Sequence, residues 1–234
     1  MRKIQIIAEI GLNWNGDIDT ARRLIYLAKL NGADIAKFQL FDTDRIFPED
    51  FEWYDLIKKC QWGKEDIAEI KNYCDTIGIE FLASVFDVER VKWTEDIGMQ
   101  RYKLASRSLV DLDLIHAIEK TDKDIIVSLG MFDVGLFPDI NTKGNVDFLY
   151  CVSKYPTQYS DLSLKFIDYN RYTGFSDHTI GIECAMIAMA RGARIIEKHF
   201  TLDKKMAGPD HICSMNPEEL ARLSDYRNIV EKVI

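Results

Sequence analysis

Short apolar runs rich in strand-forming residues alternate along the chain with segments whose apolar positions recur at the spacing of an amphipathic helix. The strand-like runs cover residues 4–11, 35–41, 80–86, 99–106, 124–131, 146–153, 173–178 and 194–200. The helical patterns cover residues 19–31, 64–77, 87–97, 111–120, 161–169, 180–192 and 216–232. This α/β order predicts a single domain over residues 1–234 with the fold of a (β/α)8 TIM barrel. The alternative, a doubly wound sheet, lacks the support of a GxGxxG or Walker loop.

Two segments interrupt the regular alternation. Residues 42–62 are long and aromatic, and they either lie over the mouth of the barrel or pack Phe47, Phe51, Trp53 and Tyr54 against its outside. Residues 132–145 contain two glycines and a proline where a helix is expected. We therefore predict that the fifth helix is shortened or missing.

Composition limits the kinds of partner that the protein can bind and indicates its cellular compartment. The formal charge of −8 and the pI near 5.1 argue against a nucleic-acid-binding surface or an acidic membrane surface, so any anion site must be built locally. The odd number of cysteines, five, without a CxxC pair, fits reduced thiols in the cytosol. No apolar run approaches the ~18 residues of a membrane span, and the N-terminus lacks the pattern of a signal peptide. We expect a soluble, cytoplasmic protein that does not associate with membranes.

Polar residues occupy the interior-facing positions at the carboxyl ends of the predicted strands. Because side chains two residues apart on a strand share a face, the barrel interior receives Glu9, Lys37, Gln39, Ser84, Lys103, Ser128, Ser153, Ser176, His178, Glu197 and His199. Buried charges cost several kcal/mol each unless they are paired. Two interpretations of the lysines stay open: ion-pair partners of Glu9 or Glu197, or a cradle for phosphate or carboxylate together with the serines.

Two of these residues, His178 and His199, end successive strands. Neighbouring parallel strands lie about 4.8 Å apart, so the two imidazoles can reach one metal ion and leave positions open for water and substrate. The simpler alternative is that His178 caps a loop and His199 fills a core position. His116, on the helical stretch 111–120, is interpreted as a surface or packing residue.

Several motifs together resemble the sialic acid synthase (N-acetylneuraminate synthase) family. They are EIGLNWNG, KFQ (37–39), KLAS (103–106), SLGM (128–131), SKYP (153–156), SDHTIG, EKHFTLD and GPDH, and they occur in the family's order over nearly the whole chain. The resemblance implies a TIM barrel that condenses phosphoenolpyruvate with an N-acetylated amino-sugar aldehyde. The products would be a nine-carbon, sialic acid-like α-keto acid and phosphate.

The resemblance also implies roles for individual residues. His178 and His199 would bind a divalent metal, usually Mn2+, with Mg2+ or Co2+ as alternatives. The residues around phosphoenolpyruvate would be Lys37, Ser84, Lys103, Ser106, Ser128, Ser153 and Ser176, with Lys37 and Lys103 holding its phosphate and carboxylate. Glu9 and Asp210 would lie near the aldehyde and the attacking water, and either could orient that water. Gln39 and Tyr155 would complete the substrate-binding set, with Tyr155 against the acceptor.

The chain departs from the family pattern in several places. Members carry a C-terminal antifreeze-like domain that supplies an arginine to the acceptor, and no such domain is expected within residues 1–234. Trp14 stands where the family has histidine, Val85 where proline is common, and Arg107 and Ser108 where glycine and an acid usually follow the serine. We hypothesise that Arg107 contacts the acceptor, the alternative being a solvent-facing arginine.

The departures leave alternatives for partners and function. The resemblance implies a homodimer, and completion of the acceptor site by a separate protein stays open. Other functional interpretations are a different metal-dependent carbon–carbon lyase or synthase acting on a phosphorylated or sugar substrate, and a barrel that binds a phosphometabolite without turnover.

Overall fold

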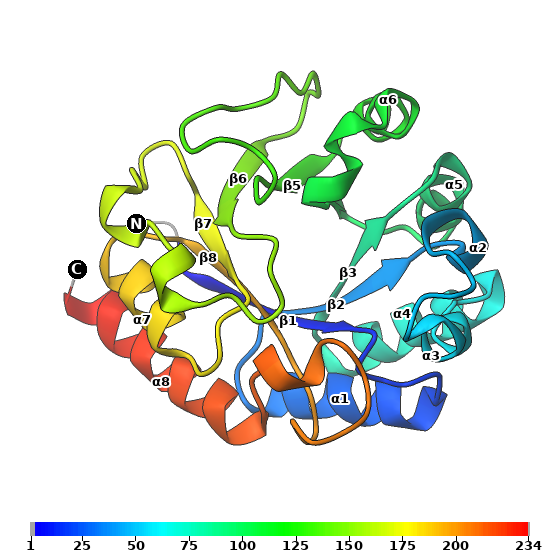
Figure 1. The fold of residues 1–234 in the computed structure, drawn as a ribbon, viewed down its shortest axis with the longest axis horizontal. Coiled ribbons are helices and arrows are strands. Elements are labelled where there is room, and N and C mark those ends of the chain that lie inside the picture. Colours follow the sequence, from blue (N-terminus) through cyan, green and yellow to red (C-terminus); the bar gives the residue numbers. More distant parts are fainter. Residues whose placement is uncertain (1–2, 234) are drawn as a thin grey trace.

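The computed structural model describes residues 3–233 as a closed barrel of eight parallel strands in sequential order (Figure 1). The strands are β1 (Gln5–Gly11), β2 (Ile35–Leu40), β3 (Glu80–Val85), β4 (Arg101–Leu104), β5 (Asp124–Ser128), β6 (Val146–Cys151), β7 (Gly174–Asp177) and β8 (Ile195–His199). Each lies within the run predicted for it, and β8 pairs with β1 to close the barrel. The predicted (β/α)8 fold is confirmed.

Helices surround most of this barrel. They are α1 (Ile18–Leu30), α2 (Thr43–Ile46), α3 (Tyr54–Lys59), α4 (Lys64–Ile77), α5 (Val88–Asp96), α6 (Leu112–Glu119), α7 (Glu183–Ala190) and α8 (Pro217–Val233). Four 3-10 turns add to them, namely η1 (Ser106–Val110), η2 (Tyr159–Asp161), η3 (Leu164–Phe166) and η4 (His211–Cys213). Within residues 3–233, none of the helices has both the length and the apolar character needed to cross a membrane.

The barrel interior has an apolar layer beneath a polar one. The apolar layer consists of Ile7, Ile35, Leu82, Ile126, Leu149 and Ile195, all buried. Two residues further along the same strands the interior positions become polar, as from Ile7 to Glu9 and from Ile35 to Lys37. The period of two in a strand therefore seals one end of the barrel with hydrocarbon and builds the other end from charged and hydroxyl groups.

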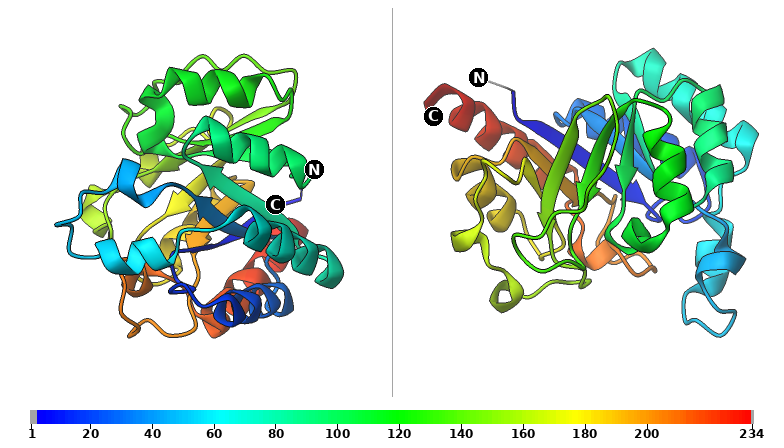
Figure 2. Two further views of the ribbon diagram at one scale, coloured as in Figure 1. Left: turned by 90° about the vertical axis from the view of Figure 1, so that its right-hand side faces the viewer. Right: turned by 90° about the horizontal axis from the view of Figure 1, so that it is seen from above.

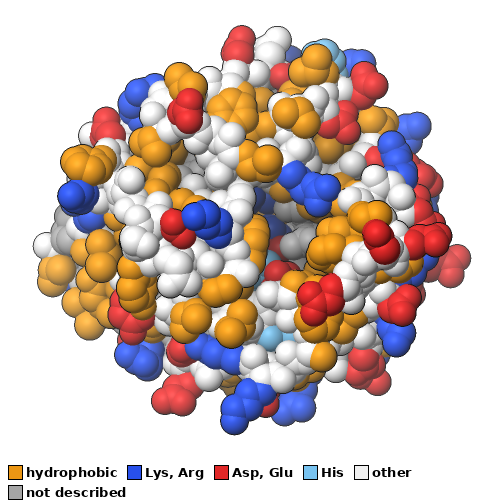
Figure 3. All heavy atoms as spheres, in the orientation of Figure 1, with side chains coloured by type: hydrophobic (Ala, Val, Ile, Leu, Met, Phe, Trp, Pro, Cys, Tyr) orange, Lys and Arg blue, Asp and Glu red, His pale blue; other side chains and the backbone are white. Residues whose placement is uncertain are grey.

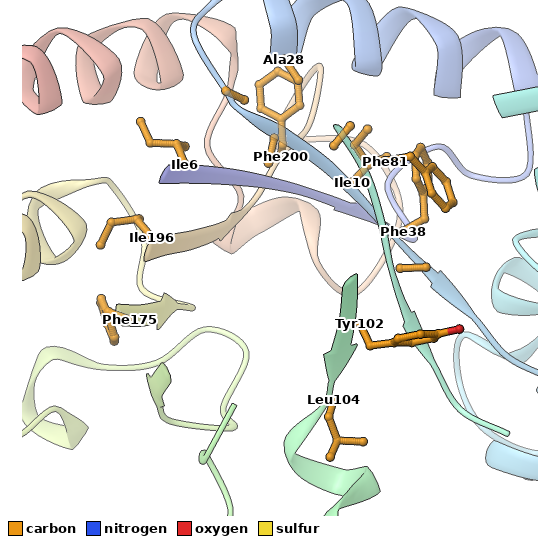
Figure 4. Close-up of a cluster of buried hydrophobic side chains, with 14 of the residues drawn as sticks. Ile6, Ile10, Ala28, Phe38, Phe81, Tyr102, Leu104, Phe175, Ile196 and Phe200 are labelled. Atoms are coloured by element: carbon orange, nitrogen blue, oxygen red, sulfur yellow. The ribbon is translucent and has the colours of Figure 1, made fainter. Parts of the chain in front are cut away.

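A second core fills the space between the strands and the helices. Its side chains come from the alternate strand positions, including Phe38, Phe81, Tyr102 and Phe175 (Figure 4). Complete burial of each large apolar side chain is worth about 1.5–3 kcal/mol. This outer layer fixes the positions of the strands and hence of the polar residues at their ends.

The segment between β5 and β6 contains no helix, as the sequence predicts. Residues 132–145 form an extended loop beside these two strands (Figure 1). Phe137 lies 5.0 Å from Phe148 and 4.9 Å from Tyr172, measured between ring centroids. An aromatic plug thus covers the strands in place of the fifth helix.

The predicted helix over residues 161–169 is wrong, because only η2 and η3 form there. Leu164 and Ile167 are buried at helical spacing, which explains the prediction. However, the amide of Ser163 donates to the hydroxyl of Tyr150 at 2.9 Å, and the amide of Asn170 donates to the Asp168 carboxylate at 2.9 Å. Side-chain acceptors of this kind compete with the helical pattern.

Residues 42–62 contain the short helices α2 and α3 and project from the barrel (Figure 2). Ile46, Phe47, Phe51 and Ile57 line a cavity at the mouth of the barrel. Trp53 packs, partly buried, against the outer core. The segment therefore lies over the mouth, and only part of it packs outside.

Candidate active site

A cavity of about 420 Å3 opens at the carboxyl ends of the strands, within the size range of small-molecule sites. Figure 3 shows the hollow near the centre of this face, with charged side chains in and beside it. Every residue predicted for the site lines this cavity: Glu9, Lys37, Gln39, Ser84, Lys103, Ser106, Arg107, Ser128, Ser153, Tyr155, Ser176, His178, His199 and Asp210. The structure brings these residues together, while their chemical roles stay predictions.

Two lysines and two glutamates form a buried network at the floor of the cavity. Lys37 Nζ lies 2.7 Å from Glu9 Oε2 and 3.5 Å from Glu197 Oε2. Lys103 Nζ lies 3.6 Å from Glu197 Oε1, which also accepts a hydrogen bond of 2.8 Å from Ser176. The sequence left open whether the lysines form ion pairs with Glu9 and Glu197, and the structure shows that they do.

The groups of this network differ in how firmly they hold their charges. Burial acts to raise the pKa of Glu197, but Lys103 and Lys37 beside it lower that pKa to about 2. Burial raises the pKa of Glu9 and lowers that of Lys103. Burial also acts to lower the pKa of Lys37, yet Glu197 and Glu9 outweigh it and raise the pKa. Because a nearby anion favours the charged form of a lysine, an anionic ligand beside Lys103 would strengthen its charge.

Serine hydroxyls surround the two ammonium groups. Lys103 donates to Ser128 Oγ at 2.7 Å, and Lys37 donates to Ser84 Oγ at 3.3 Å. Ser106 Oγ accepts from the amide of Gly130 at 2.8 Å. A side chain on Gly130 would place its Cβ 2.4 Å from the hydroxyl of Ser153 and 3.1 Å from that of Ser106. Glycine at this position thus keeps the space between the hydroxyls open.

The two histidines face each other across the cavity with ring centroids 5.6 Å apart. His178 Nδ1 donates to the carbonyl of Val152 at 2.9 Å, so its Nε2 keeps a free lone pair. Burial lowers the pKa of His178 to about 4. Burial and the neighbouring His178 hold the pKa of His199 well below its ordinary value. Both imidazoles are therefore neutral at pH 7.

Asp210 reaches the cavity from the loop after β8. Its Oδ2 lies 3.7 Å from His199 Nδ1, a buried nitrogen without a hydrogen-bond partner among the described residues. Burial, with Glu9 nearby, raises the pKa of Asp210 to about 7. His211 does not line the cavity: it hydrogen-bonds to Thr201 and Asn15 and so anchors the loop that carries Asp210.

The donor set fits a divalent metal ion with open coordination positions. Two neutral imidazoles are suitable ligands for first-row divalent metals, and His199 Nδ1 is an orphaned polar atom beside a carboxylate. Across residues 3–233, no three His, Cys, Asp or Glu side chains gather into a metal site. A metal held here would therefore complete its coordination with water or substrate, as catalytic sites do.

Sequence reasoning missed other residues that line the cavity. Cys151 lies below Ser153 on the same face of the strand, with Sγ 3.8 Å from His178 Nδ1. The alternation that identified the serines would also have placed Cys151 there. Glu197 was recognised as an ion-pair partner but not assigned to the site. Phe41 and Phe86 were also missed: they form an apolar wall with Phe47 and Phe51, whose segment the sequence placed either over the mouth or outside the barrel.

Arg107 is the second residue of η1 and is exposed at the rim of the cavity. Its guanidinium carbon lies 5.5 Å from the ring centroid of Phe47. The three other departures do not line the cavity: Trp14 stacks on Trp62 with centroids 3.8 Å apart, Val85 is buried in the outer core, and Ser108 is buried in η1. Only the departure at Arg107 changes the chemistry of the cavity.

Comparison with known proteins identifies relatives of the whole barrel. The model of the NeuB family matches residues 24–234. The N,N'-diacetyllegionaminic acid synthase of Legionella pneumophila is 33% identical over 98% of this chain and 72% of its own length. The human N-acetylneuraminate-9-phosphate synthase is 32% identical over 98% of this chain and 70% of its own.

A solved structure agrees with these sequence relatives. The N-acetylneuraminic acid (sialic acid) synthetase of Leptospira borgpetersenii, crystallised with citrate, superimposes with a TM-score of 0.91. It is 33% identical, and the match covers 99% of this chain and 85% of that one. The family match over most of the chain, the two relatives above 30% identity and the shared barrel lead to one conclusion: the chain belongs to the NeuB family.

Proposed function

We propose that the protein condenses phosphoenolpyruvate with an N-acylated amino-sugar aldehyde to give a nonulosonic α-keto acid and inorganic phosphate. The observation that carries this proposal is the presence in one cavity of two buried lysines, a set of serine hydroxyls and two neutral histidines. Membership of the NeuB family, with relatives named as legionaminic acid and N-acetylneuraminate-9-phosphate synthases, supports the same reaction.

Phosphoenolpyruvate binds at the floor of the cavity in this proposal. Lys37 and Lys103 neutralise its phosphate and carboxylate, and hydroxyl groups donate hydrogen bonds to the same oxygens. The hydroxyls are those of Ser84, Ser106, Ser128, Ser153 and Ser176. Because Glu197 already pairs with both lysines, the site is held in shape before the substrate arrives.

The acceptor aldehyde lies above the donor, next to His178 and His199. These histidines would hold a divalent metal, for which we propose Mn2+, with Mg2+ or Co2+ as alternatives. A metal bound there supplies Lewis-acid polarisation of the aldehyde oxygen. Tyr155, whose ring centroid is 4.1 Å from that of His178, borders the acceptor. Gln39 donates to Glu9 at 2.9 Å and closes the opposite side.

The reaction forms one carbon–carbon bond and releases phosphate. The methylene carbon of phosphoenolpyruvate attacks the aldehyde carbon, and the aldehyde oxygen takes up a proton to become a hydroxyl. Water then adds at C2 and gives up a proton to a carboxylate. The resulting hemiketal phosphate collapses to the ketone by breaking its bond to the phosphate oxygen.

We assign the orientation of that water to Asp210 rather than to Glu9. Glu9 is occupied by Lys37 at 2.7 Å and by Gln39 at 2.9 Å. The described contacts of the Asp210 carboxylate include no hydrogen bond, and its Oδ2 lies 3.7 Å from Nδ1 of the neutral His199. A free carboxylate lining the cavity is the one available to hold a water.

The test is incubation of the full chain with Mn2+, phosphoenolpyruvate and a panel of N-acylated hexosamine aldehydes. Phosphate release and an α-keto acid of the expected mass are the readouts. We expect metal-dependent product that is lost in His199→Ala and retained in His116→Ala, an exposed histidine remote from the cavity. Binding of phosphoenolpyruvate without product from any aldehyde, with or without metal, would contradict the proposed reaction.

A further inference from the structure

Arg107 stands apart from the other charged side chains that line the cavity. Lys37 and Lys103 pair with Glu9 and Glu197. Asp210 lies 3.7 Å from His199. Among the lysines and arginines that line the cavity within residues 3–233, Arg107 is the one without an ion-pair partner. A guanidinium beside a cavity with its charge uncompensated is available to a ligand.

An aromatic stack holds this guanidinium in place. Arg107 lies over Phe47, whose ring stacks on Phe51 with centroids 5.3 Å apart and planes at 25°. The Phe41 ring lies edge-on to Phe47, with centroids 6.5 Å apart. Arginine that stacks on an aromatic face keeps its N–H groups free for bidentate hydrogen bonds in the ring plane of the guanidinium. The stack therefore orders the side chain without consuming its donors.

The position of Arg107 separates it from the proposed phosphoenolpyruvate site. Ser106 and Ser128 are buried: the Ser106 hydroxyl donates to the Ser128 carbonyl at the end of β5, and the Ser128 hydroxyl accepts from Lys103. Arg107 is exposed, and its guanidinium lies over Phe47, in the segment that follows β2. It thus faces the outer cavity, where the part of an acceptor remote from the reacting aldehyde would lie.

We propose that Arg107 forms an anion subsite in the outer cavity and that the acceptor carries an anionic group, phosphate or carboxylate, at the end remote from its aldehyde. This inference rests on the proposed function for the identity of the acceptor. The planar, permanently charged guanidinium group binds either anion through two parallel hydrogen bonds. With a net charge of −8 on the protein, an unpaired local cation is what would admit such a substrate.

The experiment compares three acceptors that differ only at C6: N-acetylmannosamine, its 6-phosphate and N-acetylmannosaminuronate. Each is assayed with Mn2+ and saturating phosphoenolpyruvate for the parent chain, Arg107→Ala and Arg45→Ala. Arg45 is a matched control, because it lies on α2 near the mouth but does not line the cavity. We expect kcat/KM for one of the anionic acceptors to exceed that for the neutral one by at least about tenfold. Arg107→Ala should remove this advantage, and Arg45→Ala should preserve it.

A binding measurement separates failure of this inference from failure of the proposed reaction. N-acetylmannosamine and its two anionic derivatives are titrated into the parent chain and Arg107→Ala by calorimetry. If no acceptor turns over but an anionic one binds the parent chain at least about tenfold more tightly than Arg107→Ala, the subsite stands and the reaction fails. Equal behaviour of neutral and anionic acceptors overturns the subsite. A rise in the KM for phosphoenolpyruvate in Arg107→Ala, without loss of acceptor discrimination, also overturns it.

Discussion

Lys198 and Asp177 form an ion pair whose side chains are both 0% exposed, with Nζ 3.1 Å from Oδ2. They are register partners on β8 and β7, and each immediately precedes a cavity histidine in the chain: Lys198 precedes His199, and Asp177 precedes His178. Lys198 also donates to the carbonyl of Thr179 at 2.7 Å, and Asp177 accepts from the Thr179 amide at 2.9 Å. The pair ties together the two strand ends that present the imidazoles.

Removal of one member of this pair is expected to be costly. Lys198→Met leaves a buried, unpaired carboxylate, and such changes typically destabilise a fold by about 3–5 kcal/mol. The double variant Asp177→Asn with Lys198→Met should be less destabilised than Lys198→Met alone, because no buried charge is left unpaired. Urea denaturation of the variants measures this, with Lys154→Met of the exposed Lys154–Asp161 pair as a control that changes stability little. A double variant as unstable as the single one would contradict the explanation.

The histidine pair is expected to control metal binding. Loss of either imidazole in His178→Ala or His199→Ala should weaken Mn2+ binding by more than the roughly 10- to 100-fold typical of changes outside the ligand set. Calorimetric titration of Mn2+ measures this without reference to turnover. Chelation with EDTA should abolish product formation, and added Mn2+ should restore it. Unchanged Mn2+ affinity in both variants would place the metal elsewhere.

Lys103 is expected to strengthen phosphoenolpyruvate binding without raising the free energy of unfolding. Burial lowers its pKa, and Glu197 keeps Lys37 as a partner when Lys103 is replaced. Lys103→Met should therefore leave the free energy of unfolding equal or higher. Phosphoenolpyruvate should bind more weakly by about 2–5 kcal/mol, the usual cost of losing a buried charged partner. Calorimetry measures phosphoenolpyruvate binding, and urea denaturation measures the free energy of unfolding. Lys64→Met, on the surface of α4, is the control.

The cysteines are expected to be unreactive in the folded protein. All five are free and buried, and burial raises the pKa of Cys60, Cys74 and Cys213 to about 12 and that of Cys151 to about 11. At pH 8, well below these pKa values, the reactive thiolate is scarce. Titration with a disulfide reagent should detect no fast-reacting thiol in the folded protein and all five after unfolding in urea. Fast reaction of any of the five thiols in the folded protein would contradict this expectation.

The positions of the floor residues could be predicted because strand alternation is a local rule. Once Ile7 is assigned to the interior, Glu9 must follow it, and the same step leads from Ser176 to His178. The helix over residues 161–169 could not be rejected in this way, because the hydroxyl of Tyr150 that accepts the Ser163 amide is distant in the sequence. Likewise, the contact of Arg107 with Phe47 joins segments about which periodicity says nothing.

The absence of regular helices after β5 and β6 divides the barrel into two sectors of unequal covering. On one side, α7 packs on β8 and α1 on β1, α8 packs on both helices, and the amide of Ile4 donates to Glu231 of α8 at 2.7 Å. On the other, a loop plugged by Phe137 covers the strands that end in Ser128 and Cys151. Sectors with fewer packed elements open at lower free energy. We therefore expect the strands on the hydroxyl side of the cavity to exchange their amide hydrogens sooner than the strands on the histidine side.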